Sequence, residues 1–115
     1  MVSAASLKKI ALSFPETTEE PHFEKTSFRV KKKIFATYNS ATKQACLKLS
    51  LTDQDIFSLA AKEIIYPVKN KWGTQGWTII ETQKVDEDLF KDAILNAYCN
   101  VAPPALAGNV KITSR

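Results

Sequence analysis

The sequence predicts an α+β domain, in which helices pack on one face of an antiparallel sheet and the element order is α-β-β-β-α-β-β-α. Three observations predict this class. Apolar residues recur at helical spacing in three segments, and five short runs between them have the composition or the alternation of strands. Consecutive strands have short connections, which favours antiparallel pairing. Each helix has a single apolar face, so the helices must bury that face against the sheet.

The first helix is predicted for residues 4–14, with Ser3 as its N-cap and Pro15 as its end. Its apolar face consists of residues at helical spacing, namely Ala4, Leu7, Ile10, Ala11 and Phe14. The next segment, from Glu16 to Pro21, is polar and ends in proline. We therefore expect a loop that leads into a strand.

Three strands are predicted between Phe23 and Ser50. Phe28 and Val30 flank Arg29, Lys31 to Lys33 form a polar turn, and Ile34 to Tyr38 is rich in β-branched and aromatic residues. A second turn at residues 39–42 precedes residues 45–50, where apolar and polar residues alternate. The three strands are expected to form an antiparallel meander.

The second half of the chain is predicted to contain a helix, a hairpin and a long final helix. Thr52 and Asp55 resemble a capping box, and the apolar face of the helix that follows consists of Ile56, Phe57, Leu59 and Ala60. Residues 64–68 and 77–82 are expected to pair as strands, joined by the polar segment 70–76. The final helix, residues 85–101, has acidic residues at its start, a wide apolar stripe, and Pro103 and Pro104 beyond its end.

Composition and length set the domain organisation and exclude several classes of protein. The 115 residues correspond to one domain, which we assign to residues 1–104, with residues 105–115 as a loose C-terminal tail. No apolar stretch approaches the length that crosses a bilayer, and no signal-peptide core precedes Lys8 and Lys9. We expect a cytoplasmic protein with no membrane partner.

The two cysteines and the single histidine do not form a recognisable metal or redox motif. Cys46 and Cys99 are far apart in the sequence, and one histidine does not complete a zinc site with them. Both are expected to be reduced and mostly buried thiols. No metal and no cofactor are therefore expected.

Positive charge is concentrated in one stretch of the chain. The formal net charge is +4, but residues 25–50 contain seven Lys and Arg residues and no Asp or Glu. The candidate phosphate ligands here are Arg29, Lys31, Lys32, Lys33 and Lys43, with Lys48 nearby. A basic two-stranded ribbon can neutralise DNA phosphates and fits the major groove. The alternative is a solvated edge whose lysines prevent association between sheets.

A second basic segment combines cations with indole rings. Lys69, Lys71 and Trp72 lie in the connection between the two predicted strands of the second hairpin. Trp72 can stack on a base, whereas Trp77 alternates in phase with Ile79 and is expected in the core. Gly73 and Gly76 are expected to serve the turn conformation.

An acidic segment precedes the basic stretch. Glu16, Glu19, Glu20 and Glu24 surround His22, which is a combination that can bind a metal or transfer protons. No nucleophile and no second histidine accompany them. We interpret the segment as a charged loop that balances the basic hairpin.

Two stretches of the chain resemble the MmcQ/YjbR-like family of small bacterial proteins, over about residues 5 to 106. The first contains Phe14-Pro15-Glu16, Glu19-Glu20, and Phe28-Arg29-Val30 leading to Phe35-Ala36. The second is Asn70-Lys71-Trp72-Gly73-Thr74-Gln75-Gly76-Trp77-Thr78-Ile79, followed by Val101-Ala102-Pro103. The resemblance implies a fold like that of the secretion chaperones. It also implies DNA binding by two β-hairpins that act as a pair of wings. Some members have a His-Trp sequence where this chain has Gly76-Trp77.

The leading functional hypothesis is a non-enzymatic module that binds DNA weakly, with little sequence preference, through its two basic hairpins. The alternative is a protein-interaction or chaperone-like module whose exposed sheet face or edge takes a partner segment. Small-ligand binding is a third hypothesis, for which the sequence offers no residues with assignable roles.

Overall fold

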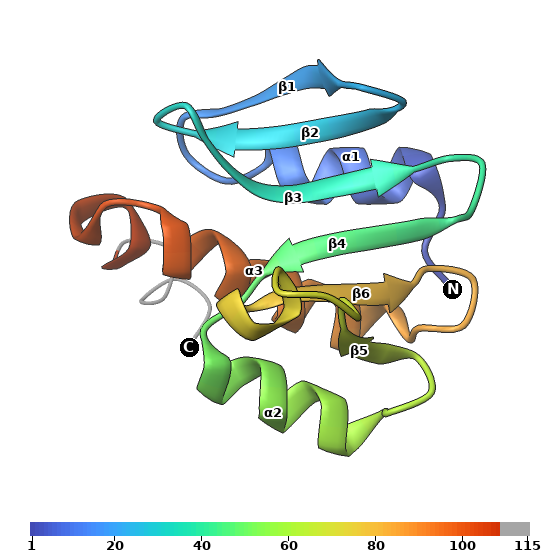
Figure 1. Ribbon diagram of the computed structural model, residues 1–115. Coiled ribbons are helices and arrows are strands. Elements are labelled where there is room, and N and C mark those ends of the chain that lie inside the picture. Colours follow the sequence, from blue (N-terminus) through green and yellow to red (C-terminus); the bar gives the residue numbers. More distant parts are fainter. Residues whose placement is uncertain (109–115) are drawn as a thin grey trace.

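The computed structural model describes residues 1–108 and confirms the predicted α+β class (Figure 1). Its sheet has six antiparallel strands in the order β1-β2-β3-β4-β6-β5. The predicted element order is present, with one further strand inserted between the first helix and the three predicted strands. The elements are α1 (Ala4–Leu12), β1 (Thr17–His22), β2 (Lys25–Val30), β3 (Lys33–Asn39), β4 (Gln44–Lys48), α2 (Leu51–Ala60), β5 (Ile65–Pro67), the 3₁₀ helix η1 (Gly73–Gln75), β6 (Trp77–Glu81) and α3 (Glu87–Val101).

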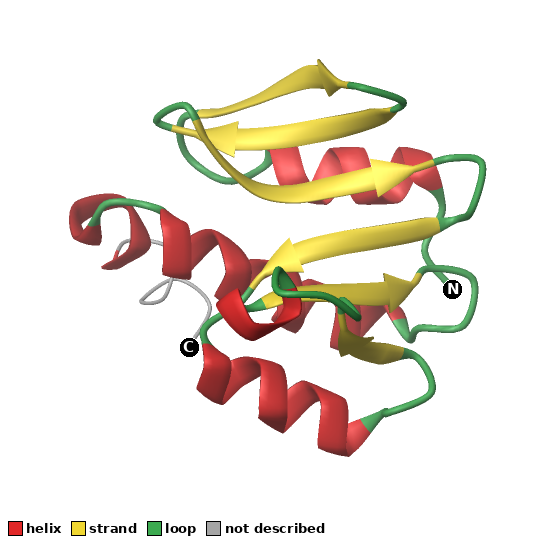
Figure 2. Cartoon of the chain, viewed as in Figure 1, coloured by secondary structure: helices red, strands yellow, loops and turns green. Residues whose placement is uncertain are grey.

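Helices α1 and α3 lie behind the sheet, and α2 lies along its β5 edge (Figure 2). The strand residues that face the helices alternate with those that face away, and Phe28, Leu47 and Ile80 are among the buried ones. Phe14, Phe35 and Tyr98 form a cluster of aromatic rings between β3 and the helices. The opposite face of the sheet has no α-helix over it in the part of the chain that is described, although the 3₁₀ helix η1 lies in front of β6.

The starts of α1 and α3 agree with the sequence signals to within two residues, whereas α1 ends at Leu12 and not at the predicted residue 14. The Ser3 hydroxyl accepts a hydrogen bond from the backbone N–H of Ser6 at 3.1 Å, as the predicted N-cap of α1. In α3 the Asp86 carboxylate accepts bonds from the N–H groups of Asp88 and Leu89. Helix α3 ends before Pro103, because proline has no N–H to continue the ladder.

The prediction of a loop from Glu16 to Pro21 is wrong, because residues Thr17–His22 form the edge strand β1. It pairs with β2 from Thr17 opposite Val30 to His22 opposite Lys25. The strand is almost wholly polar because most of its side chains are exposed at the edge of the sheet, so it lacks an apolar alternation that would identify it. Pro21 is tolerated because it lies in an edge strand.

The prediction for α2 was wrong in its start and in its buried face. The cap is Ser50, whose hydroxyl accepts from the N–H of Asp53, so the helix begins before Thr52. Phe57 is buried as predicted, but Ile56 and Leu59 are exposed, and the second buried residue is Gln54. A helix at the edge of a sheet buries only a narrow stripe, which explains why two of the aliphatic residues remain outside.

The chain continues as helix beyond Pro103. Residues 104–108 are helical and Ala107 is buried against the core, whereas residues 105–108 were predicted as part of a loose tail. The backbone N–H groups of Leu106 and Ala107 both donate to the carbonyl of Pro103, at 3.0 Å each. The rest of the predicted tail, residues 109–115, lies outside the described residues.

Candidate nucleic-acid interface

The two basic connections lie at the same end of the sheet. The β2–β3 turn contains Lys31 and Lys32, and the β5–β6 connection, residues 68–76, contains Lys69 and Lys71. Antiparallel pairing places both toward the left in Figure 1. Three strand spacings of about 4.8 Å separate the two hairpins, or roughly 14 Å.

Lys43 lies at the opposite end. It belongs to the β3–β4 turn, at the right in Figure 1, where its carbonyl accepts a bond from the N–H of Thr82. The structure therefore does not bring Lys43 together with the other sequence-predicted cations. Lys33, predicted in the turn, is the first residue of β3 and pairs with Val30.

The β2–β3 turn is built from two lysines in the left-handed conformation. The backbone φ angles of Lys31 and Lys32 are 50° and 68°. Positive φ at both central residues is the requirement of the type I′ hairpin turn, where Asn and Gly are preferred. Residues with a Cβ are strained in this conformation. The turn holds both side chains in solvent at the tip of the hairpin.

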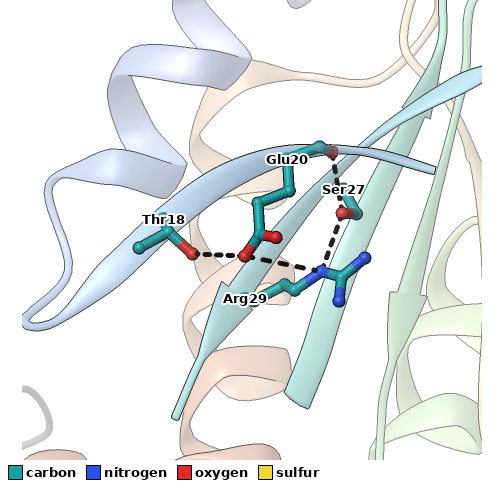
Figure 3. Close-up of polar contacts among 4 residues, drawn as sticks. All are labelled: Thr18, Glu20, Ser27 and Arg29. Atoms are coloured by element: carbon teal, nitrogen blue, oxygen red, sulfur yellow. Dashed lines mark hydrogen bonds and ion pairs between the residues drawn. The ribbon is translucent and has the colours of Figure 1, made fainter. Parts of the chain in front are cut away.

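Two of the predicted phosphate ligands have glutamate partners. Lys31 Nζ lies 2.6 Å from Glu16 Oε1, and both side chains are about half exposed. Arg29 Nε lies 3.9 Å from Glu20 Oε2 and donates to Ser27 Oγ at 3.1 Å (Figure 3). Thr18 holds the same carboxylate from the other side. The acidic segment thus balances part of the basic hairpin, as its composition indicated.

Four exposed lysines remain at this end. Among residues 1–108, Lys32, Lys33, Lys69 and Lys71 have no carboxylate within ion-pair distance. We call these four residues the basic end. Lys48, on β4, points its ammonium at the carbonyl of Gln75 and so fastens the 68–76 segment to the sheet.

The 68–76 segment is held by backbone geometry that requires its two glycines. Gly76 has a φ of 103°, and a Cβ on Gly73 would lie 1.9 Å from the carbonyl oxygen of Val68. The buried amide of Gln54 donates to the carbonyl of Gly73 at 2.9 Å and to Thr78 Oγ1 at 3.1 Å. Because the segment is fastened in this way, it presents Trp72 at a fixed place.

Trp72 is exposed and Trp77 is not in the core. The Trp72 side chain is 49% exposed, and Lys71 Nζ lies 5.8 Å from the centre of its ring. Trp77 is paired opposite Lys48 on the uncovered face of the sheet, so the expectation that Trp77 packs in the core was wrong. Thr78 and Ile80 are the β6 residues that face the helices. Alternation showed that Trp77 and Ile79 share a face, but not which face.

A groove of about 350 Å³ crosses the uncovered face. We call it the sheet groove, and its walls come from five strands (β1, β2, β3, β4 and β6) and from the 68–76 segment. It is lined by His22, Lys25, Ile34, Thr37, Cys46, Val68, Asn70, Trp72 and Trp77. A smaller cavity of about 140 Å³ shares Lys25, Thr37, Cys46 and Val68 and extends toward Asn39 and Gln44.

The thiol in the floor of the sheet groove is not activated. Burial raises the pKa of Cys46 to about 11, although the Lys25 ammonium lowers it in part. The thiol is therefore protonated at neutral pH and is a poor nucleophile.

At the far end of the face, the hydrogen bond from Tyr66 to Glu81 raises the pKa of Tyr66 to about 12.

Sequence reasoning missed Lys25 and His22 as residues of this face. Both were visible in the sequence, but the surface that they share with Trp72 depends on β1 and on the fold of the 68–76 segment over the sheet. Among the described residues, no three His, Cys, Asp or Glu side chains are placed to hold a metal ion. Within the same residues, no helix has the length and apolar character to cross a bilayer.

Comparisons with known proteins identify the family. No curated protein sequence gives a significant match. The crystal structure of the Deinococcus radiodurans protein DR2400, which has the DUF419 domain, is similar to the chain with a TM-score of 0.75 and 19% sequence identity. The alignment covers 96% of this chain and 89% of that chain, and at this identity the likeness shows the fold. The YjbR family model matches residues 12–100, which include both basic connections. The chain therefore belongs to the YjbR family, as the resemblance in its sequence indicated.

Proposed function

We propose that the chain is a non-enzymatic module that binds DNA weakly and with little sequence preference, through phosphate contacts at its basic end. The observation that supports this proposal is the position of four exposed lysines, without anionic partners among residues 1–108, on two connections at one end of the sheet. Phosphate contacts of this kind carry no sequence information.

The expected affinity follows from the number of cations. Lysines that neutralise phosphates release counterions, and the slope of log K against log salt is about −0.9 per phosphate on duplex DNA. Four contacts therefore predict a slope near −3.6. Dissociation constants of ~10⁻⁴ to 10⁻⁶ M are expected near physiological salt.

The paired cations contribute less. An exposed ion pair such as Lys31 with Glu16 is worth at most ~1 kcal/mol, so a phosphate can replace the carboxylate when DNA is present. Arg29 is more buried and is engaged by Ser27 as well as Glu20. Lys43 is left out of the proposal because it lies at the other end of the sheet.

The test compares two variants with the same net charge. In the first, the lysines of the basic end, Lys32, Lys33, Lys69 and Lys71, are all replaced by Gln. In the matched control, four exposed lysines elsewhere are replaced by Gln, namely Lys9, Lys43, Lys62 and Lys84. Fluorescence anisotropy with a labelled duplex is measured over a salt series. The first variant is expected to lose most of the slope, and the control to retain it. Equal slopes in the two variants would refute the proposed site.

Protein binding is the second candidate, favoured by the exposed aliphatic side chains of α2. Leu51, Ile56 and Leu59 are 55%, 57% and 85% exposed on one side of that helix. A partner protein that remains bound at high salt and is released by Leu59→Asp would support this candidate, because phosphate-driven binding is lost at high salt.

A further inference from the structure

The sheet groove is bounded by flat rings. The side chains of His22, Trp72 and Trp77 line it, and the ring of Phe23 lies 4.9 Å from that of His22, outside the groove. The 3₁₀ helix and the residues before it hold Trp72 over the sheet, where its indole is 49% exposed. The floor of the sheet groove is aliphatic, with Ile34 and Val68, and includes the protonated Cys46 thiol.

The charge around the sheet groove is positive. Neither the groove nor its smaller neighbour is lined by a carboxylate from the described residues, whereas Lys25 lines both. Lys69 and Lys71 alternate in the sequence with Asn70 and Trp72, which line the groove. The side-chain NH₂ groups of Asn70, and of Asn39 in the neighbouring cavity, can bond to the edge of a base, while their oxygens accept backbone N–H bonds. The Gln44 amide already donates to Glu81.

We propose that the sheet groove takes an unpaired nucleobase, which makes the chain bind single-stranded nucleic acid more tightly than duplex. The inference rests on the proposed function and names the form of nucleic acid that is preferred. Cations beside aromatic rings on an open surface are the combination by which proteins bind single strands. The face of a base is hidden in a duplex by its neighbours, so duplex DNA reaches only the lysines of the basic end.

The expected contribution of Trp72 is large enough to measure. Stacking of one base on an aromatic side chain changes the affinity roughly 5- to 150-fold. Trp72→Leu removes the ring without changing the charge or a side-chain hydrogen bond of the described structure. The affinity for a single strand is therefore expected to fall, while the slope against salt remains unchanged.

Intrinsic fluorescence reports directly on the groove. The chain contains two tryptophans, and both line the sheet groove. The probes are a 12-nucleotide oligothymidylate, a 12-unit strand of the same phosphodiester backbone with abasic sugars, and a 12-base-pair duplex. The oligothymidylate is expected to quench the emission and to bind most tightly, whereas the abasic strand leaves the emission unchanged. Leu59→Ala on the distant helix α2 is the control variant and is expected to bind like the parent chain.

The outcomes separate the two proposals. Equal affinities for the oligothymidylate and the abasic strand, without loss in Trp72→Leu, overturn the groove inference and leave phosphate binding at the basic end intact. Binding of the duplex in preference to the oligothymidylate also overturns it. Non-specific binding has its weak limit near ~100 µM at physiological salt and is tighter at low salt, so if none of the three probes binds at low salt up to that protein concentration, the proposed function itself fails.

Discussion

The substitution Lys32→Gly tests the strain and the function of the β2–β3 turn together. Lys32 is exposed, and its backbone φ of 68° is in the left-handed region that favours glycine. That conformation costs a residue with a Cβ about 1–2 kcal/mol. Glycine loses about 0.5–1 kcal/mol more than alanine in conformational entropy on folding. The expected net result is a gain of roughly 0.5–1 kcal/mol in the free energy of unfolding.

The same substitution removes one cation of the basic end. The slope of log K against log salt on duplex DNA is expected to become shallower by about 0.9. Lys43→Gly is the matched control, because Lys43 has a φ of 58° and lies at the other end of the sheet. It should give a similar gain in stability and leave the slope unchanged.

Urea unfolding followed by circular dichroism measures the free energy of unfolding, and fluorescence anisotropy over a salt series measures the slope of log K against log salt. A loss of stability in Lys32→Gly would show that the turn is not strained. Equal slopes for Lys32→Gly and Lys43→Gly would show that Lys32 does not contact phosphate.

Three further predictions concern the acidic segment, the thiol and the core. Glu16→Gln frees Lys31 and is expected to tighten duplex binding up to about 5-fold at low salt, since an exposed pair is worth at most ~1 kcal/mol; unchanged anisotropy titrations would exclude Lys31 from the interface. Burial raises the pKa of Cys46 to about 11, so the thiol is expected to resist iodoacetamide at pH 8 in the folded protein and to react on unfolding. Rapid modification of the folded protein, measured by mass spectrometry, would contradict the burial of this thiol. Phe90→Ala is expected to lower the free energy of unfolding by about 3–5 kcal/mol, because the ring of this α3 residue is fully buried in the core. A decrease below ~1 kcal/mol in urea unfolding would disprove that packing.

The stability contributed by Glu81 has a defined dependence on pH. The hydrogen bond from Tyr66 holds the pKa of the Glu81 carboxyl below its usual range. A depressed pKa means that the stabilisation is present above the pKa of the unfolded chain and is lost as the pH falls through the folded value. It follows that the stability difference between the parent chain and Glu81→Gln shrinks as the pH is lowered.

The fold was largely predictable because its main elements have their own local signals. Ser3 and Asp86 mark the starts of α1 and α3, and Pro103 marks the end of α3. The polar strand β1 has no such signal, since it pairs with β2 along one edge only and most of its side chains are exposed. The buried face of α2 depends on Gln54, a polar residue whose burial follows from acceptors in the 68–76 segment.

The candidate site was only partly predictable. Charge along the sequence identified the lysines but not their ion pairs, which depend on the register of the strands. The register that sets Thr17 opposite Val30 places Glu16 near Lys31. The direction of Trp77 is likewise a property of the sheet, since both faces of β6 carry apolar residues. The sheet groove depends on the return of residues 68–76 over the strands, which hydrogen bonds from Gln54 and Lys48 enforce.

An NMR titration of the ¹⁵N-labelled chain with the 12-nucleotide oligothymidylate tests the central claim most directly. The account predicts that amide shifts change in the β2–β3 turn, in residues 68–77 and around Lys25, while the exposed side of α2 is unaffected. Shifts confined to α2 or to the Lys43 turn, or an unchanged spectrum at low salt, would contradict the account.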